Sequence, residues 1–135
     1  MNGDKLQIGD WVQSKEDGKY HKVLGVTKQS DNSIWIATDI GVMFDYMYEP
    51  IPLAKVHLTK NGFKAREETD DTEFYYYDCY EINVSFDEGL PEDDIPPIIF
   101  ITIEFAEKSI AMPIEYLHEL QNAMRLFDIE KEIVL

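Results

Sequence analysis

The chain has 135 residues, 44% of them hydrophobic and 13% aromatic, and a formal net charge of −15. This length suits a single domain, and the apolar content argues against intrinsic disorder. Residues 1–66 hold nine Lys/Arg against eight Asp/Glu, whereas residues 67–135 hold three against nineteen, a balance of −16. An anionic surface repels phosphates and attracts basic proteins. The charge therefore argues against direct nucleic-acid binding and favours a protein partner with a basic surface.

The cysteine content and the apolar segments bear on the compartment. The single Cys79 cannot form an internal disulfide, which argues against a cross-linked secreted scaffold. Residues 1–10 lack the apolar core of a signal peptide. The longest strongly apolar run, residues 95–103, contains two prolines and is far shorter than the ~20 residues of a membrane-spanning helix. We expect a cytoplasmic protein that does not contact a membrane.

The first part of the chain reads as short strands separated by turn residues. Apolar and β-branched residues gather in the runs 6–12, 20–26, 34–38 and 42–46. Short runs at this spacing are typical of a small bent sheet or barrel. We expect an SH3-like β-barrel over residues 1–49.

A proline pair and a glycine delimit the next element. Pro50 and Pro52 end the strand region, because proline cannot donate to a sheet. Residues 53–61 suit a short helix whose inward stripe holds Leu53, Val56 and either His57 or Lys60. Gly62 stands where a left-handed residue ends a helix, with Phe63 placed to fold back on the last turn. The polar residues 64–73 read as a connecting loop.

The rest of the chain predicts a β-meander followed by a helix. Strands are expected over 74–78, 80–86 and 97–105, with an acidic turn at 87–94 and a short return strand over 110–112. A helix is expected over 113–127, with Pro113 in its first turn. Its apolar face comprises Ile114, Leu117, Leu120, Met124 and Phe127. Residues 132–135 are expected to add an edge strand.

These elements define an α+β fold. It consists of a bent N-terminal β-unit, a short helix, an antiparallel meander and a C-terminal amphipathic helix. We expect residues 1–135 to form one compact unit, with a possible subdivision into 1–49 and 50–135, because no flexible linker separates the two parts.

Partial motifs favour structural roles over catalysis or metal binding. His118-Glu119 begins like a zinc-protease motif, but Asn122 stands where the second His belongs. Cys79 has acidic neighbours, which disfavour a thiolate and favour a buried structural thiol. The acids of residues 87–94 lack the ligand order of a calcium loop, since Leu90 and Pro91 interrupt them. We expect no cofactor and no metal.

Aromatic clusters also have two readings. The tyrosines at 75–77 resemble a base-stacking platform, but basic residues are missing around them, so cross-strand packing is preferred. Trp11 and Trp35 suit either the filling of a small barrel or an aromatic peptide groove, and barrel filling is preferred.

Three segments in chain order resemble a known pattern: Leu6-Gln-Ile-Gly-Asp10, Pro50-Ile-Pro-Leu53 followed by Asn61-Gly-Phe63, and Tyr116-Leu-His-Glu-Leu-Gln-Asn122. They resemble an uncharacterised family of small bacterial proteins of prophages and other mobile elements. In that family a Thr, which is a good helix N-cap, follows the Pro-Ile-Pro-Leu segment, and Ala54 replaces it here. The resemblance implies a cytoplasmic accessory protein and supplies no catalytic residues.

The sequence thus favours a non-enzymatic protein that binds other proteins. The alternative is a DNA mimic that occupies the nucleic-acid site of a basic protein. His118 and Gln121 join the candidates because the core stripe of the helix does not require polar residues there. The partner-binding candidates are Asp87, Glu88, Glu92, Asp93, Asp94, His118 and Gln121.

Overall fold

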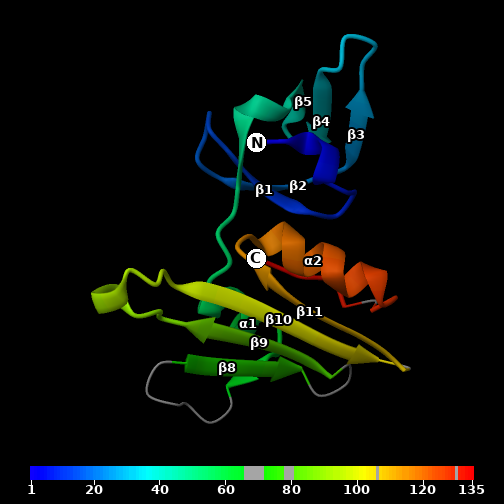
Figure 1. Cartoon of the computed structure of the whole chain (residues 1–135). Coiled ribbons are helices and arrows are strands. Elements are labelled where there is room, and N and C mark those ends of the chain that lie inside the picture. Colours follow the sequence, from blue (N-terminus) through cyan, green and yellow to red (C-terminus); the bar gives the residue numbers. More distant parts are fainter. Residues whose placement is uncertain (66–71, 78–80, 106, 130) are drawn as a thin grey trace. The chain divides into compact units, whose positions relative to one another are not determined.

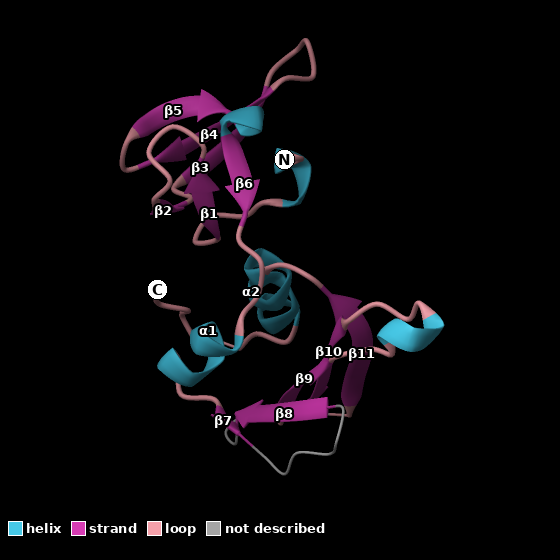
Figure 2. Ribbon diagram, turned by 90° about the vertical axis from the view of Figure 1, so that its left-hand side faces the viewer, coloured by secondary structure: helices cyan, strands magenta, loops and turns pink. Residues whose placement is uncertain are grey.

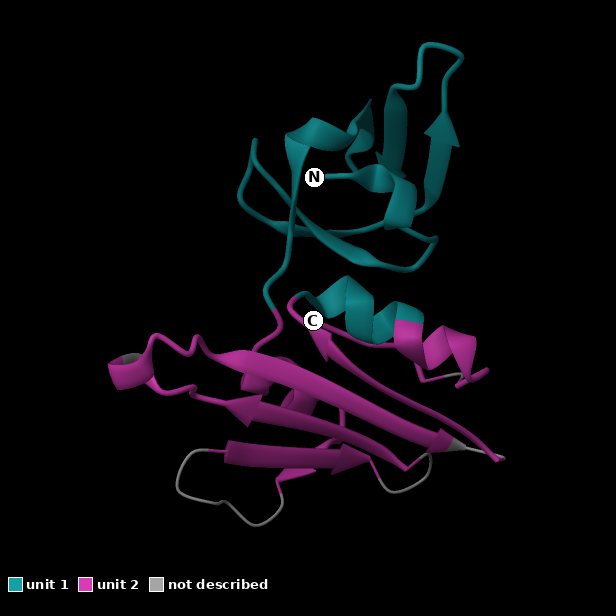
Figure 3. Cartoon of the chain, viewed as in Figure 1, with its two compact units in different colours: residues 1–52, 116–122 teal, residues 53–115, 123–135 magenta. Residues whose placement is uncertain are grey.

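The computed structural model describes residues 1–65, 72–77, 81–105, 107–129 and 131–135. It shows a mixed α+β protein made mostly of β-sheet, with two α-helices (Figure 1). The chain divides into two compact units, which are coloured in Figure 3. Unit 1 comprises residues 1–52 and 116–122, and unit 2 comprises residues 53–115 and 123–135. None of the described helices is long and apolar enough to cross a membrane.

Unit 1 contains two three-stranded antiparallel sheets, ordered β2-β1-β6 and β3-β4-β5. Its strands are β1 (Trp11–Ser14), β2 (Tyr20–Lys22), β3 (Gly25–Lys28), β4 (Ile34–Thr38), β5 (Gly41–Phe44) and β6 (Tyr48–Pro50). Burial alternates along β4, as a strand with one covered face requires. The core cluster comprises Leu6, Val12, Val23, Ile36 and Tyr48. The described strands form no closed barrel, so the predicted SH3-like barrel is not confirmed.

One predicted strand of this unit differs from the structure. The run 20–26 is split, because the backbone N–H of Val23 donates to the carbonyl of Asp10 and that of Leu24 donates to the carbonyl of Ala37, in the other sheet. The chain therefore changes sheets between these two residues. The first run contains the turn that its Gly-Asp pair indicates: the N–H of Gln7 donates to the Asp10 carboxylate at 2.9 Å, and the strand begins at Trp11.

Unit 2 is built on a five-stranded antiparallel sheet ordered β11-β10-β9-β8-β7. The strands are β7 (Lys64–Ala65), β8 (Thr72–Tyr77), β9 (Ile82–Asp87), β10 (Ile98–Phe105) and β11 (Lys108–Ile114). The inner face carries the buried side chains of Tyr75, Ile82, Val84, Ile101 and Ile103. Figure 2 shows α1 (Lys55–Lys60) on this side of the sheet.

Local chemistry explains both ends of α1. Ala54 offers no side-chain oxygen, and its N–H instead donates to Nδ1 of His57 at 3.0 Å. At the other end Gly62 has φ +87°, and the N–H of Phe63 donates to the carbonyl of Leu58 at 3.0 Å. This is the predicted Schellman ending. The predicted inward Val56 is wrong, since it is exposed and Leu58 is buried in its place.

The last elements depart most from expectation. Pro113 lies in β11 opposite Phe100 and not in a helix, which an edge strand tolerates because it needs fewer backbone donors. The second helix, α2 (Leu117–Leu126), therefore begins later than predicted. The expected edge strand at 132–135 is absent, and Val134 instead bonds in both directions with the side-chain amide of Asn61. Cys79 lies outside the described residues.

Candidate protein-binding surface

The structure places the predicted binding residues in two settings. Asp87 is the last residue of β9, and Glu88, Glu92, Asp93 and Asp94 lie on the loop between β9 and β10, in unit 2. His118 and Gln121 lie on the first part of α2, in the segment assigned to unit 1. The two sets are therefore described separately.

The β9–β10 loop (residues 88–97) has a defined hydrogen-bonded backbone. The Asp87 carboxylate accepts from the N–H of Gly89 at 2.8 Å. Leu90 and Ile95 exchange two backbone hydrogen bonds of 3.0 Å each, which close a short 3₁₀ turn at Pro91–Asp93. Asp87 is half-buried and acts as a turn cap, whereas the other four acids are exposed. The loop holds these four carboxylates on a fixed frame.

Gly89 allows the backbone of the loop to pass close to Ile95 and Pro96. Its φ is +73°, and a Cβ there would stand 2.3 Å from the carbonyl oxygen of Ile95 and 2.7 Å from Pro96 backbone atoms. Backbone atoms cannot move aside as a flexible side chain can. The loop conformation therefore requires glycine at this position.

Apolar side chains stand exposed among the acids. Leu90 is 45% exposed and Ile95 is 49% exposed. Ile98 and Phe100 continue the exposed apolar surface into β10. Isolated exposed apolar residues are ordinary, but a group of them surrounded by one sign of charge is typical of an interaction site. The sequence revealed the acids of this surface but not its apolar component.

Gln121 is a buried link within unit 1. Its Nε2 donates to the carbonyl of Gly9 at 3.0 Å, and its Oε1 accepts from the N–H of Trp11 at 3.1 Å. The side chain is only 5% exposed. Its amide thus satisfies two backbone groups at the start of β1, which explains why a polar residue stands at this helix position.

His118 is buried without such partners. Its ring stacks on Tyr116 with the centroids 5.9 Å apart, and its buried Nδ1 atom has no hydrogen-bond partner. Desolvation lowers the pKa of His118 below its usual 6.5, so the ring is neutral at pH 7. The sequence indicated a histidine on the surface of the helix, which is wrong, since His118 is buried. A role of His118 and Gln121 in binding a partner stays a prediction.

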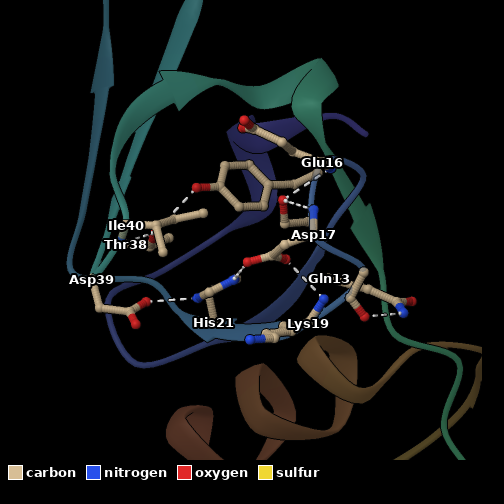
Figure 4. A network of polar contacts seen from close by, with 11 residues as sticks. Gln13, Glu16, Asp17, Lys19, His21, Thr38, Asp39 and Ile40 are labelled. Atoms are coloured by element: carbon tan, nitrogen blue, oxygen red, sulfur yellow. Dashed lines mark hydrogen bonds and ion pairs between the residues drawn. The ribbon is translucent and has the colours of Figure 1, made fainter.

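A polar network around His21 escaped the sequence analysis (Figure 4). The buried imidazole lies between two carboxylates, with Nδ1 2.7 Å from Asp39 and Nε2 2.9 Å from Asp17. Burial alone would lower the pKa of His21, but the hydrogen bonds to Asp39 and Asp17 outweigh it and raise the pKa above 6.5. Asp17 and Asp39 lie in two different turns and His21 lies in β2, so the sequence gives no motif for the network.

The arrangement favours the protonated form of His21. In that form each ring nitrogen donates to one carboxylate, and neither keeps a free lone pair. The protonated ring is not available as a general base or a metal ligand. Among the described residues, no group of three or more His, Cys, Asp or Glu side chains could hold a metal ion.

The His21 network predicts how the stability of unit 1 depends on pH. Because its pKa is raised by folding, His21 contributes stability that is fully present below pH 6.5 and is lost as the pH rises through the folded value. Replacing Asp39 with Asn should lower this pKa and cost about 0.5–1 kcal/mol below pH 6.5, since Asp39 is largely exposed. NMR titration of the ring and urea unfolding at several pH values measure both effects. Asp31→Asn, an acid remote from His21, serves as the control; an equal shift there would contradict the assignment.

Comparisons with known proteins supply no relative: no protein-family model, no curated protein and no solved structure matches the chain.

Proposed function

We propose that this protein is a non-enzymatic interaction protein that binds a basic protein partner through the β9–β10 loop. The observation that carries the proposal is the exposure of Leu90 and Ile95 among four exposed carboxylates on a loop with a defined backbone. Carboxylates steer a basic partner and fix its orientation, while desolvated apolar side chains supply binding energy.

The same observation favours protein binding over DNA mimicry. A mimic presents carboxylates alone, in the manner of phosphates along a duplex. Exposed Leu90 and Ile95 have no counterpart in a phosphate backbone. They suit a partner surface that carries apolar as well as basic groups.

The proposal extends to the setting of the protein. A cytoplasmic accessory role in a phage or another mobile element agrees with the three segments that resemble such proteins. An SH3-like character of residues 1–49 is supported by their short strands in two small sheets, with a 3₁₀ turn at Asp45–Met47 before the last strand. Neither point is needed for the binding proposal.

Neutralising the loop tests the proposal. The protein is cross-linked to its partners in a bacterial lysate. A variant in which Glu88, Glu92, Asp93 and Asp94 become the corresponding amides should capture far fewer proteins than the wild type. The capture of the remaining proteins should no longer depend on the salt concentration. The matched control neutralises Glu16, Glu49, Glu107 and Asp128, four exposed acids outside the loop. Quantitative mass spectrometry of the cross-linked proteins provides the measurement. Equal recovery of the cross-linked proteins by both variants would show that the loop does not bind them.

A further inference from the structure

We infer that the outer face of the five-stranded sheet in unit 2 binds a basic amphipathic helix, which defines the partner of the proposed function more closely. This outer face is the side of the sheet opposite to α1 (Figure 2). Among the described residues of unit 2, no α-helix lies on this face. The inference rests on the proposed function for the origin of its partner, but its tests change residues other than the four exposed carboxylates of the loop.

The register of the strands brings an apolar row to the centre of this face. Directly paired residues of antiparallel strands point to the same side of a sheet. The pairings place Phe74 beside Ser85, Ser85 beside Phe100, and Phe100 beside Pro113. This row crosses four strands, from β8 to β11.

Ser85 has the smallest side chain of the row. Its hydroxyl donates to the carbonyl of Phe100, so an apolar group placed over it leaves no new polar group unpaired. Phe74 and Phe100 stand on the strands to either side, two strand spacings apart, or roughly 10 Å. An α-helix with its side chains is about 10–12 Å wide. A helix lying along β9 can therefore contact Phe74 and Phe100 with one face.

The charges at the two ends of the face indicate the charge pattern of the helix that would bind there. Asp87, paired with Ile98, lies at the end that adjoins the acidic loop, and Glu104 lies toward the other end of β10. The described basic residue of the face is Lys64, opposite Tyr76 on the short β7. A helix with an apolar centre and basic residues at both ends complements this pattern.

The same geometry gives the length of the helix. Ile98 and Glu104 are six positions apart on β10, which corresponds to about 20 Å along a strand. A helix covers about 20 Å in roughly 13 residues. Its apolar residues should recur at i, i+3, i+4 and i+7 to form one stripe.

A designed peptide tests the inference directly. The probe is a fluorescein-labelled helix of about 13 residues, with a central stripe of leucines and lysines at both ends. The comparator has the same composition in scrambled order and thus the same charge. At physiological ionic strength, fluorescence anisotropy should show the amphipathic peptide binding at least about tenfold more tightly than the scrambled one. Equal affinities would overturn the inference, because they would reflect charge alone.

Variants locate the binding on the face. Ser85→Lys places a cation between Phe74 and Phe100 and should weaken binding of the amphipathic peptide by at least about tenfold. Phe100→Thr keeps a strand-forming residue but removes the aromatic side chain. We expect the affinity for the peptide to fall roughly fivefold to tenfold. Thr59→Lys adds the same charge on the exposed side of α1 and should leave the affinity unchanged. Circular dichroism verifies that each variant is folded.

The loop-neutralised variant separates the two proposals. If it weakens binding while Ser85→Lys and Phe100→Thr bind like the wild type, the loop binds and the face does not, which overturns this inference alone. If only the face variants weaken binding, the inference stands and the loop loses its proposed role. If all of them weaken binding, both proposals are supported. If none does, both are overturned.

Discussion

Replacing Gln121 with Leu should destabilise unit 1 by roughly 2–3 kcal/mol, because two partly buried backbone groups lose their partner at once. The carbonyl of Gly9 and the N–H of Trp11 are both bonded to this amide. Leucine has nearly the same volume and a better helix propensity, so packing and helix formation do not account for the loss. What remains is the cost of depriving a donor and an acceptor of this amide in a partly buried place.

Tryptophan fluorescence during urea unfolding measures this effect selectively. The chain has two tryptophans, Trp11 and Trp35, and both belong to unit 1. Asn122→Leu is the matched control, since its amide also donates to a backbone carbonyl, that of Lys5 at 3.0 Å, but in an exposed position. We expect that control to cost less than about 1 kcal/mol. A similar loss for both variants would show that Gln121 is not a buried link.

Elements with a complete local signal could be predicted from the sequence. Strand β4 alternates strictly, and its predicted bounds agree with the structure. The end of α1 was predicted through Gly62 because a left-handed backbone and the Phe63 contact are encoded in consecutive residues. The first half of α1 was less certain, since a helix of six residues is too short for its apolar period to separate Val56 from Leu58.

Features that depend on distant partners could not be predicted. Pro113 suits both a first helical turn and an edge strand, and only the pairing with β10 decides between them. The His21 network joins turns that are unrelated in sequence. The density of acids did indicate the β9–β10 loop. Its exposed Leu90 and Ile95 escaped notice because single residues carry no sign of which side they face.

Replacing Gly89 with Ala should disrupt the β9–β10 loop without changing its charge. Two penalties combine: alanine at φ +73° costs about 1–2 kcal/mol, and a Cβ 2.3 Å from a carbonyl oxygen forces the backbone apart, at a further cost of about 1–3 kcal/mol. The amide protons of Leu90 and Ile95, which bond across the loop, should then exchange much faster with solvent. Hydrogen exchange followed by NMR measures this at single residues.

Gly18→Ala separates the clash from the backbone strain. Gly18 has φ +70°, almost the same as Gly89, but nothing lies within 4 Å of its Cβ position. It should cost only the first penalty and leave the exchange of Leu90 and Ile95 unchanged. Partner binding then discriminates between two roles of the loop. If the loop acts only through its negative charge, partner binding should be unchanged in Gly89→Ala, because all the carboxylates remain. If binding needs the shape of the loop, the variant should bind more weakly, since Leu90 and Ile95 are held in place by the conformation that this glycine allows.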